Sequence, residues 1–216
     1  VLKCWGWGIS LGLGMNQQNS STPLNVLTSS GTQGTARVTT NYSNTCIAEQ
    51  VIFFSFGVDQ PIKCWGPNNH GHVGDNTTLR RYTPTTPTYE GSSFTARFLS
   101  TGIQFACAIS QIGLENRKAF CWGNGSLGKL GNPLTTDRLT PTPVTGLNND
   151  VTSISAGGTH ACAIHQDILK CWGDNRAGQL GDGSTTDRTT PVNVQGLSSG
   201  ITTIATAPES LSWCSS

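Results

Sequence analysis

Eight cysteines carry the most definite chemistry in this sequence of 216 residues. Half of them open the triplet Cys-Trp-Gly, and the other half lie outside it. The triplet cysteines are Cys4, Cys64, Cys121 and Cys171, and the others are Cys46, Cys107, Cys162 and Cys214. An even number of cysteines is typical of a disulfide framework, although cysteines also bind zinc.

The segment between Cys162 and Cys171 favours a disulfide. It fits two short strands joined by a two-residue turn at Gln166-Asp167, and this register places the two cysteines opposite each other. Facing Cβ atoms of antiparallel strands lie about 4.5–5.5 Å apart, close to the roughly 3.5–4.5 Å that a disulfide needs. The pairs Cys107–Cys121 and Cys46–Cys64 follow with longer loops. We therefore expect three local disulfides and an oxidising, extracellular or cell-surface location.

Other site chemistry has weaker support. Zinc requires four converging ligands with short Cys-x-x-Cys or histidine spacings, which this sequence lacks, and disulfide bonding leaves no thiolate nucleophile. His70 and His72 flank a glycine, a pattern that fits a metal or two solvated loop side chains. Asp174, Asp182 and Asp187 suggest calcium, but Pro67, Asn124 and Gly8 lie near the first of these positions in the other repeats. We expect no catalytic residue, no cofactor, no metal and no enzyme activity.

Asn-x-Ser/Thr sequons are a further class of candidate site. They occur at Asn19, Asn41, Asn76 and Asn124, all in predicted loops or at strand edges. They become glycosylation sites only in an organism with the corresponding pathway.

The elements that must position these residues are sequence repeats. After the triplet cysteines, glycine recurs at +10 in all four repeats, and glycine at +7 and arginine at +17 in the last three. The +7 glycines are Gly71, Gly128 and Gly178, the +10 glycines are Gly14, Gly74, Gly131 and Gly181, and the arginines are Arg81, Arg138 and Arg188. Successive triplet cysteines are 60, 57 and 50 residues apart, a period typical of propeller blades or solenoid coils.

The most regular repeat resembles a known family. Residues 151–191 contain Ile-Ser-Ala-Gly-Gly-x-His-x-Cys-Ala-Ile, followed by Cys-Trp-Gly-Asp-Asn-x-x-Gly-Gln-Leu-Gly-Asp-Gly-x-Thr-Thr-Asp-Arg-x-x-Pro. This pattern is similar to the regulator of chromosome condensation repeat, in the cysteine-bearing form of secreted, largely bacterial proteins. The similarity decreases toward the N-terminus, where Leu11 replaces the +7 glycine and Ser21 the +17 arginine. The resemblance implies an all-β propeller of four-stranded blades.

We interpret the chain as one repeat domain, residues 1–216, with repeat cores near residues 4–58, 64–109, 121–164 and 171–214. Short alternating strands and turn clusters predominate, and a loop is expected at Pro84 and Pro87. The arginines are expected to fix loops through ion pairs, with Asp137 and Asp187 beside two of them, or through hydrogen bonds to carbonyls. The triplet tryptophans are expected to pack between blades rather than to stack on sugars; they are Trp5, Trp65, Trp122 and Trp172.

Composition argues against several classes of partner. Only 12% of the residues are charged, and 13 basic and 12 acidic side chains give a net charge of +1. A nucleic-acid surface needs clustered lysine and arginine, and these are scattered here. No apolar run reaches the roughly 18 residues of a membrane span. We expect neither nucleic-acid binding nor a membrane span.

The two ends of the sequence carry complementary halves of a repeat. The Cys-Trp-Gly half comes first, at Cys4, and the other half comes last, at Cys214. We expect residues 211–214 to pair with residues 2–5 and Cys4 to bond Cys214, within one chain or head to tail between chains. Closure within one chain gives a four-bladed monomer, a secreted module that recognises or adheres to a glycan or protein ligand. We favour the second arrangement, an extracellular structural protein that assembles with copies of itself into a ring or filament.

Overall fold

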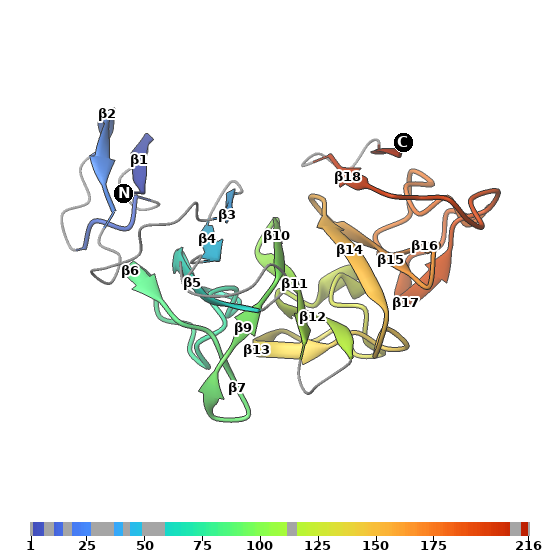
Figure 1. Ribbon diagram of the computed structural model, residues 1–216, viewed down its shortest axis with the longest axis horizontal. Coiled ribbons are helices and arrows are strands. Elements are labelled where there is room, and N and C mark those ends of the chain that lie inside the picture. The colour runs from blue at the N-terminus through green and yellow to red at the C-terminus, as the bar shows by residue number, and fades with distance from the viewer. Residues whose placement is uncertain are drawn as a thin grey trace.

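The chain folds into a series of small antiparallel sheets, as the computed structural model shows (Figure 1). The structure describes residues 2–6, 11–14, 19–26, 37–40, 44–48, 59–111, 116–207 and 213–215. The regular structure in these ranges consists of β-strands and one short 3-10 helix, which confirms the expected all-β class. Within the same ranges, no helix has the length and apolar character of a membrane span.

Three sheets each run through four consecutive strands. The first contains β3 (Arg37–Thr40), β4 (Thr45–Ala48), β5 (Gln60–Gly66) and β6 (Arg81–Thr85), with β9 (Thr95–Ala96) beside β5. The second contains β10 (Phe98–Gly102), β11 (Phe105–Gln111), β12 (Arg117–Gly123) and β13 (Arg138–Pro143). The third contains β14 (Val151–Ala156), β15 (His160–His165), β16 (Ile168–Gly173) and β17 (Arg188–Asn193). Each is a simple antiparallel meander in chain order.

Shorter elements complete the described structure. At the two ends of the chain, β1 (Lys3–Gly6) pairs with β2 (Ser20–Asn25), and β18 (Ile204–Thr206) pairs with β19 (Trp213–Ser215). In the first half, β7 (Thr88–Tyr89) pairs with β8 (Ser92–Ser93). The 3-10 helix is η2 (Ser126–Gly128).

The second and third strands of each four-stranded sheet form the hairpin that carries the cysteines. The predicted turn at Gln166-Asp167 is present, and both residues have positive φ, 51° and 62°, as a tight hairpin turn requires. The register between the third and fourth strands shifts by two residues between the cysteine and the glycine of Cys-Trp-Gly, because the fourth strand contains the extra residues. Gly173 has φ +108°, and a Cβ there would lie 2.7 Å from the carbonyl oxygen of Thr159. Only glycine fits this bulge.

The fourth strands contain prolines, so the expectation of a loop at Pro84 was wrong, whereas Pro87 lies between strands. Pro84 lies in β6, Pro141 in β13 and Pro191 in β17. Each of these strands is the last in the strand order of its sheet. Proline is tolerated at such an edge because its missing N–H leaves no neighbouring strand without a donor.

The hydrophobic core lies between neighbouring sheets. Trp122 of the second sheet packs with Val73 and Phe94, which precede that sheet in the chain. Trp172 of the third sheet packs in the same way with Leu130 and Val144. Each sheet therefore covers the apolar surface of the sheet before it, as in other stacked-repeat proteins.

Hydroxyl groups link the first strands of successive sheets. In each link a side-chain oxygen accepts the backbone N–H of the next first strand. The links run from Thr101 to Thr39 (3.2 Å), from Ala156 to Ser100 (2.9 Å) and from Thr206 to Ser155 (3.1 Å). Each hydroxyl residue lies opposite the disulfide cysteine of its own sheet. The same position in β18 is Ala205, opposite Cys214.

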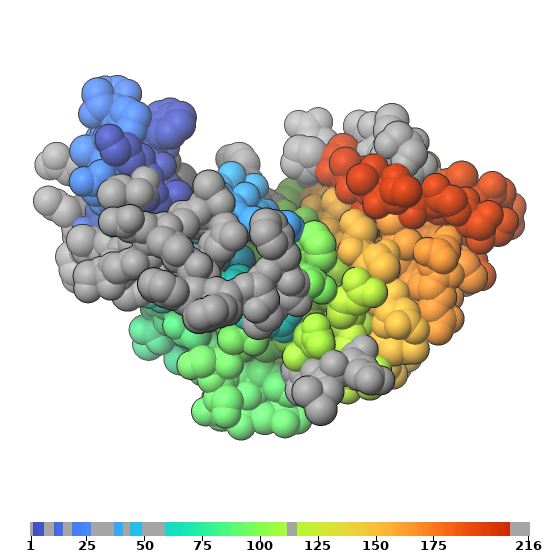
Figure 2. Space-filling model, viewed as in Figure 1, coloured from blue at the N-terminus to red at the C-terminus, as the bar shows by residue number. Residues whose placement is uncertain are grey.

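The molecule is an open arc. Figure 1 shows β1 and β2 at one end and β18 at the other, with the three larger sheets between them. In the space-filling view (Figure 2) the described residues of the two ends, blue and red, stand apart on the same side of the arc. The first and last strands of the chain are therefore separated in space.

Candidate functional site

The three local disulfides are present as predicted. They join Cys46 to Cys64, Cys107 to Cys121 and Cys162 to Cys171, with a Cα–Cα distance of 4.1 Å in each. The cysteines of each pair lie directly opposite each other on adjacent strands. Each disulfide therefore connects the second and third strands of one sheet and leaves the outer strands to hydrogen bonding and packing.

Cys4 has a different environment. It lies in β1 opposite Leu24, partly buried, and its thiol is free. Burial raises the pKa of this thiol above its usual range. Cys214 lies at the other end of the arc, in β19, paired with β18. The structure of the single chain thus contains no bond from Cys4 to Cys214.

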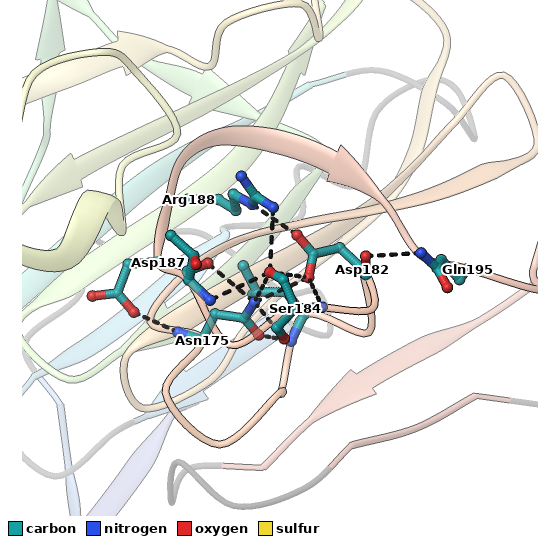
Figure 3. A network of polar contacts seen from close by, with 8 residues as sticks. Asn175, Asp182, Ser184, Asp187, Arg188 and Gln195 are labelled. Carbon is teal, nitrogen blue, oxygen red and sulfur yellow. Dashed lines mark hydrogen bonds and ion pairs between the residues drawn. The ribbon is translucent and has the colours of Figure 1, made fainter.

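A polar network fixes the loop that follows the fourth Cys-Trp-Gly triplet (Figure 3). The fully buried Asn175 donates through Nδ2 to Asp182 Oδ1 at 3.1 Å and to the carbonyls of Ser184 and Thr186, both at 3.1 Å. Its Oδ1 accepts the backbone N–H of Leu180 at 3.0 Å. One amide side chain thereby holds both sides of the loop.

The carboxylates of this loop are stabilised in their charged form. Burial alone would raise the pKa of Asp182, but hydrogen bonds from Ser184 and from Arg188 Nε, at 2.7 Å, lower it to about 2. The guanidinium of Arg176 and the hydroxyl of Thr159 hold the pKa of Asp174 well below its usual range. These carboxylates are neutralised by donors of the same chain.

The network recurs in the second repeat but not in the third. Asn68 donates to Asp75 and to the carbonyls of Thr77 and Leu79, and Arg81 bonds Asp75. In the third repeat the same positions hold Gly125 and Asn132. The Nε of Arg138 and the Nδ2 of Asn132 are buried there without a hydrogen-bond partner.

Arg81 and Arg188 thus fix loops as expected, but through a different partner, and Arg138 forms no such ion pair. In the second and fourth repeats the partner is the aspartate at +11, Asp75 or Asp182, and not the aspartate beside the arginine. Asp137 and Asp187 instead accept the backbone N–H groups of Gly125 and Asn175, at 3.0 and 2.8 Å. Sequence reasoning missed the +4 asparagine and the +11 aspartate, although both recur in two repeats.

The candidate calcium ligands and the two loop histidines lie in separate environments. Asp174, Asp182 and Asp187 bond separate donors, and among the described residues no three His, Cys, Asp or Glu side chains gather as a metal site. His70 pairs with Asp137 at 2.8 Å, whereas His72 is buried. The expectation of two solvated loop histidines is therefore wrong for His72.

His160 is a packing residue at a buried repeat position. Its equivalents are Phe105 and Asn44, and all three are fully buried. Burial lowers the pKa of His160, and Asp174 offsets part of this effect.

The sequons differ in accessibility. Asn19 and Asn76 are exposed, and Asn41 lies outside the described residues. Asn124 is only 9% exposed, and its Nδ2, the atom that would carry a glycan, faces His70 Nδ1 at 3.3 Å and Gln104 Oε1 at 3.4 Å. Because Asn124 points inward, we no longer expect glycosylation there and retain the two exposed asparagines.

The triplet tryptophans do not behave alike. Trp65, Trp122 and Trp172 are fully buried between sheets, as predicted, whereas Trp5 is 64% exposed.

The first repeat also has a shorter loop. A Cβ on Gly12 would lie 2.9 Å from Trp65, as Gly74 and Gly131 approach the next tryptophans, so Gly12 and not Gly14 has the +10 role. Gly6 pairs with Ser20, where the other repeats pair glycine with arginine, so Ser20 and not Ser21 replaces that arginine.

The end strands form the candidate interaction site. β1 and β2 have the pairing of a third and fourth strand, because Cys4 pairs with Leu24 as Cys171 pairs with Val192. β18 and β19 have the pairing of a first and second strand. Within the described residues, β1 pairs only with β2 and β19 only with β18. Each end is half of a four-stranded sheet.

Comparison with known proteins identifies the repeats. Residues 118–164 and 171–208 match the Regulator of chromosome condensation (RCC1) repeat. The Ultraviolet-B receptor UVR8 of Arabidopsis thaliana is 31% identical over 102 residues, which cover 46% of this chain and 22% of UVR8.

Solved structures have the same fold. Human WBSCR16 matches 95% of this chain with a TM-score of 0.72 and 21% identity, and the match covers 50% of WBSCR16. Yeast RCC1 (Prp20), in its complex with Kap60, matches 93% of this chain with a TM-score of 0.68 and 21% identity, over 46% of Prp20. The chain thus spans about half the length of these two structures and about a fifth of UVR8.

Proposed function

Because this chain contains repeats of the RCC1 family and has their propeller-type fold, we propose that it is a non-enzymatic extracellular structural protein that associates with copies of itself, head to tail. The observation that carries this proposal is the pair of complementary half-sheets, β1–β2 at one end and β18–β19 at the other. Strand edges without a partner promote association. The three disulfides support an oxidising compartment.

The complete sheets indicate how two copies would join. In them a second strand pairs with a third, and the two cysteines face each other. By the same register, β19 of one copy pairs with β1 of the next, and Cys214 lies opposite Cys4. Trp213 then lies opposite Trp5, where the complete sheets have small residues; these are Thr45, Ala106 and Ala161. The shared sheet is a fourth blade, split between the two ends of the chain.

The geometry of the contact decides the form of the assembly. A head-to-tail contact gives a ring when the rotation closes and a filament when it does not. We expect one of these two assemblies.

Sedimentation and non-reducing mass spectrometry of the native chain test the proposal. We expect a species of twice the 22.8 kDa chain mass, or a longer series, joined by Cys4–Cys214 bonds between chains. A monomer with Cys4 bonded to its own Cys214 would instead support the closed module that binds a glycan or protein ligand. A folded monomer with both thiols free would refute the strand pairing in either form.

A further inference from the structure

The second repeat has an extra hairpin between its fourth strand and the next sheet. In the second, third and fourth repeats this connection begins with the same backbone hydrogen bond to the +10 glycine. The donors are Thr88, Thr145 and Gln195, and the acceptors are the carbonyls of Gly74, Gly131 and Gly181, at 2.9, 2.9 and 2.8 Å. The third and fourth repeats then have one glycine, Gly146 or Gly196, before the next leucine. The second repeat has residues 89–93 there, and they form the β7–β8 hairpin.

The core does not need these extra residues. Phe94, which follows the hairpin, occupies the position of Leu147 in the third repeat, and both side chains are buried. The backbone N–H of Phe94 donates to the carbonyl of Pro87 at 2.9 Å, as that of Leu147 donates to Val144 at 3.2 Å. The third repeat thus reaches the same packing with a single glycine. Insertions into one repeat of an array often lie on a binding surface.

The hairpin forms one wall of a surface pocket with a volume of about 280 Å³. The pocket is lined by Tyr89, Glu90, Ser92, Ser93, Phe94, Thr95 and Ser110, of which the first four belong to the insertion. The Tyr89 ring makes edge contacts with Phe94 and Phe120, at centroid distances of 6.3 and 5.2 Å. The Ser110 hydroxyl is oriented by its hydrogen bond to Asp59 Oδ2, at 2.9 Å. The pocket is therefore formed without a ligand, as is usual for small-molecule sites.

Hydroxyl groups dominate the lining of this pocket. One tyrosine, three serines and one threonine each carry a hydroxyl, and a hydroxyl both donates and accepts hydrogen bonds. Among the lining residues, all of which the structure describes, Glu90 is the one charged side chain. A negatively charged ligand would find no opposite charge here, whereas a neutral ligand with several hydroxyl groups finds a partner for each. The Tyr89 ring adds an apolar surface for C–H groups.

We propose that this pocket binds one neutral sugar unit of a glycan. Its volume is just below the range of about 300–1,000 Å³ that is typical for drug-sized ligands, so a single sugar ring fits and its neighbours remain in solvent. The sugar hydroxyls exchange hydrogen bonds with the serines, the threonine and Glu90, and the C–H face of the ring packs on Tyr89. Figure 1 shows β7 on the side of the arc away from β1, β2 and β18. The pocket is therefore separate from the proposed contact between copies.

A shortened turn tests the proposal with a template from the same chain. Replacing residues 89–93 by one glycine gives the second repeat the turn of the third and fourth. The probes are the methyl glycosides of glucose, galactose, mannose and N-acetylglucosamine, titrated by NMR. The native chain should bind at least one of them with a dissociation constant on the order of 1 mM. The shortened variant should bind none and should keep the disulfides and the self-association of the native chain.

A point variant tests the pocket without changing the backbone. Tyr89→Phe keeps the ring contacts and removes one hydroxyl, so it should raise the dissociation constant about tenfold. Its control is Tyr82→Phe in β6, a tyrosine that does not line the pocket, and this variant should bind like the native chain.

Three results would overturn the inference. They are a native chain that binds none of the glycosides, a shortened variant that binds them equally well, and a preference for the tetramethylammonium cation over every glycoside. Sedimentation of the same samples measures self-association separately, so failure of the sugar site and failure of the head-to-tail contact are distinguishable.

Discussion

Asn175 makes more hydrogen bonds to its own loop than any residue that sequence reasoning singled out. From a fully buried position it bonds a carboxylate, two carbonyls and a backbone N–H. Replacing it by alanine leaves the N–H of Leu180 buried without an acceptor, and such groups cost about 1–3 kcal/mol each. We expect Asn175→Ala to lower the free energy of unfolding by about 3 kcal/mol, measured by urea denaturation with the disulfides intact.

The exposed Asn193 provides the control for Asn175. Its Oδ1 accepts one hydrogen bond, from Lys170 Nζ at 2.8 Å at the surface. Asn193→Ala should change the free energy of unfolding by less than about 0.5 kcal/mol. Equal effects of the two variants would mean that the loop network contributes little to stability.

His72 gives the protein a pH-dependent stability. Burial lowers its pKa to about 4, the nearby His70 acts in the same direction, and a contact with the Pro67 carbonyl, outside ordinary hydrogen-bond geometry, and the charge of Asp137 offset only part. The unfolded histidine has a pKa of about 6.5. Between these two values only the unfolded chain binds the proton, so this contribution is fully present above pH 6.5 and is lost as the pH falls toward 4.

Replacing this histidine tests the effect directly. His72→Phe removes a proton-binding site of the unfolded state and a buried ring without hydrogen bonds. The variant should lose up to about 1.4 kcal/mol per pH unit of the native slope between pH 4 and 6.5. Denaturant melts at several pH values measure both slopes, and parallel curves would show that His72 is not responsible.

At the scale of elements, the Cys162–Cys171 disulfide joins the two strands of one short hairpin, β15 and β16. Closing a loop of this size stabilises a fold by about 2–3 kcal/mol. The double replacement Cys162→Ala and Cys171→Ala should reduce stability by that amount while the folded spectrum is retained. Free alkylation of these cysteines in the untreated native protein would show that the bond does not form.

The hairpins could be predicted from sequence because local spacing determines them. The nine-residue separation of Cys162 and Cys171 fixes both the turn and the facing register. The fourth strands could not be predicted so easily. Pro84, Pro141 and Pro191 suggest loops unless the strand is known to be an edge, and this depends on neighbouring sheets.

The loop network was only partly accessible to sequence reasoning. The arginine at +17 recurs in three repeats, but its partner at +11 lies six residues away in the sequence, and aspartates nearer in the sequence compete for the assignment. The shift from Gly14 to Gly12 in the first repeat was hidden for a related reason. The shortened loop changes the offset of the glycine from the triplet cysteine, while the contact of that glycine with the next tryptophan, Trp65, keeps its geometry.

At the scale of the whole molecule, the small net charge is the reason that we do not expect nucleic acid as a partner. With 13 basic and 12 acidic side chains, the chain has no charge excess to release counterions from a nucleic acid. We expect no salt-dependent shift of DNA mobility at submicromolar protein, and no nucleotide exchange on a small GTPase. A mobility shift that weakens with added salt would contradict this prediction.

Ala205 has a consequence for how the proposed head-to-tail assembly responds to force. Inside a copy, each pair of neighbouring first strands is tied by a hydroxyl group, from Thr39, Ser100 or Ser155. Ala205 has no hydroxyl to offer the first strand that follows it, so the joint between copies lacks a tie that every internal joint has. Once the Cys4–Cys214 bonds are reduced, a ring or fibre of this protein should part at its seams under tension or dilution, and the pieces released would be whole, folded subunits ready to rejoin.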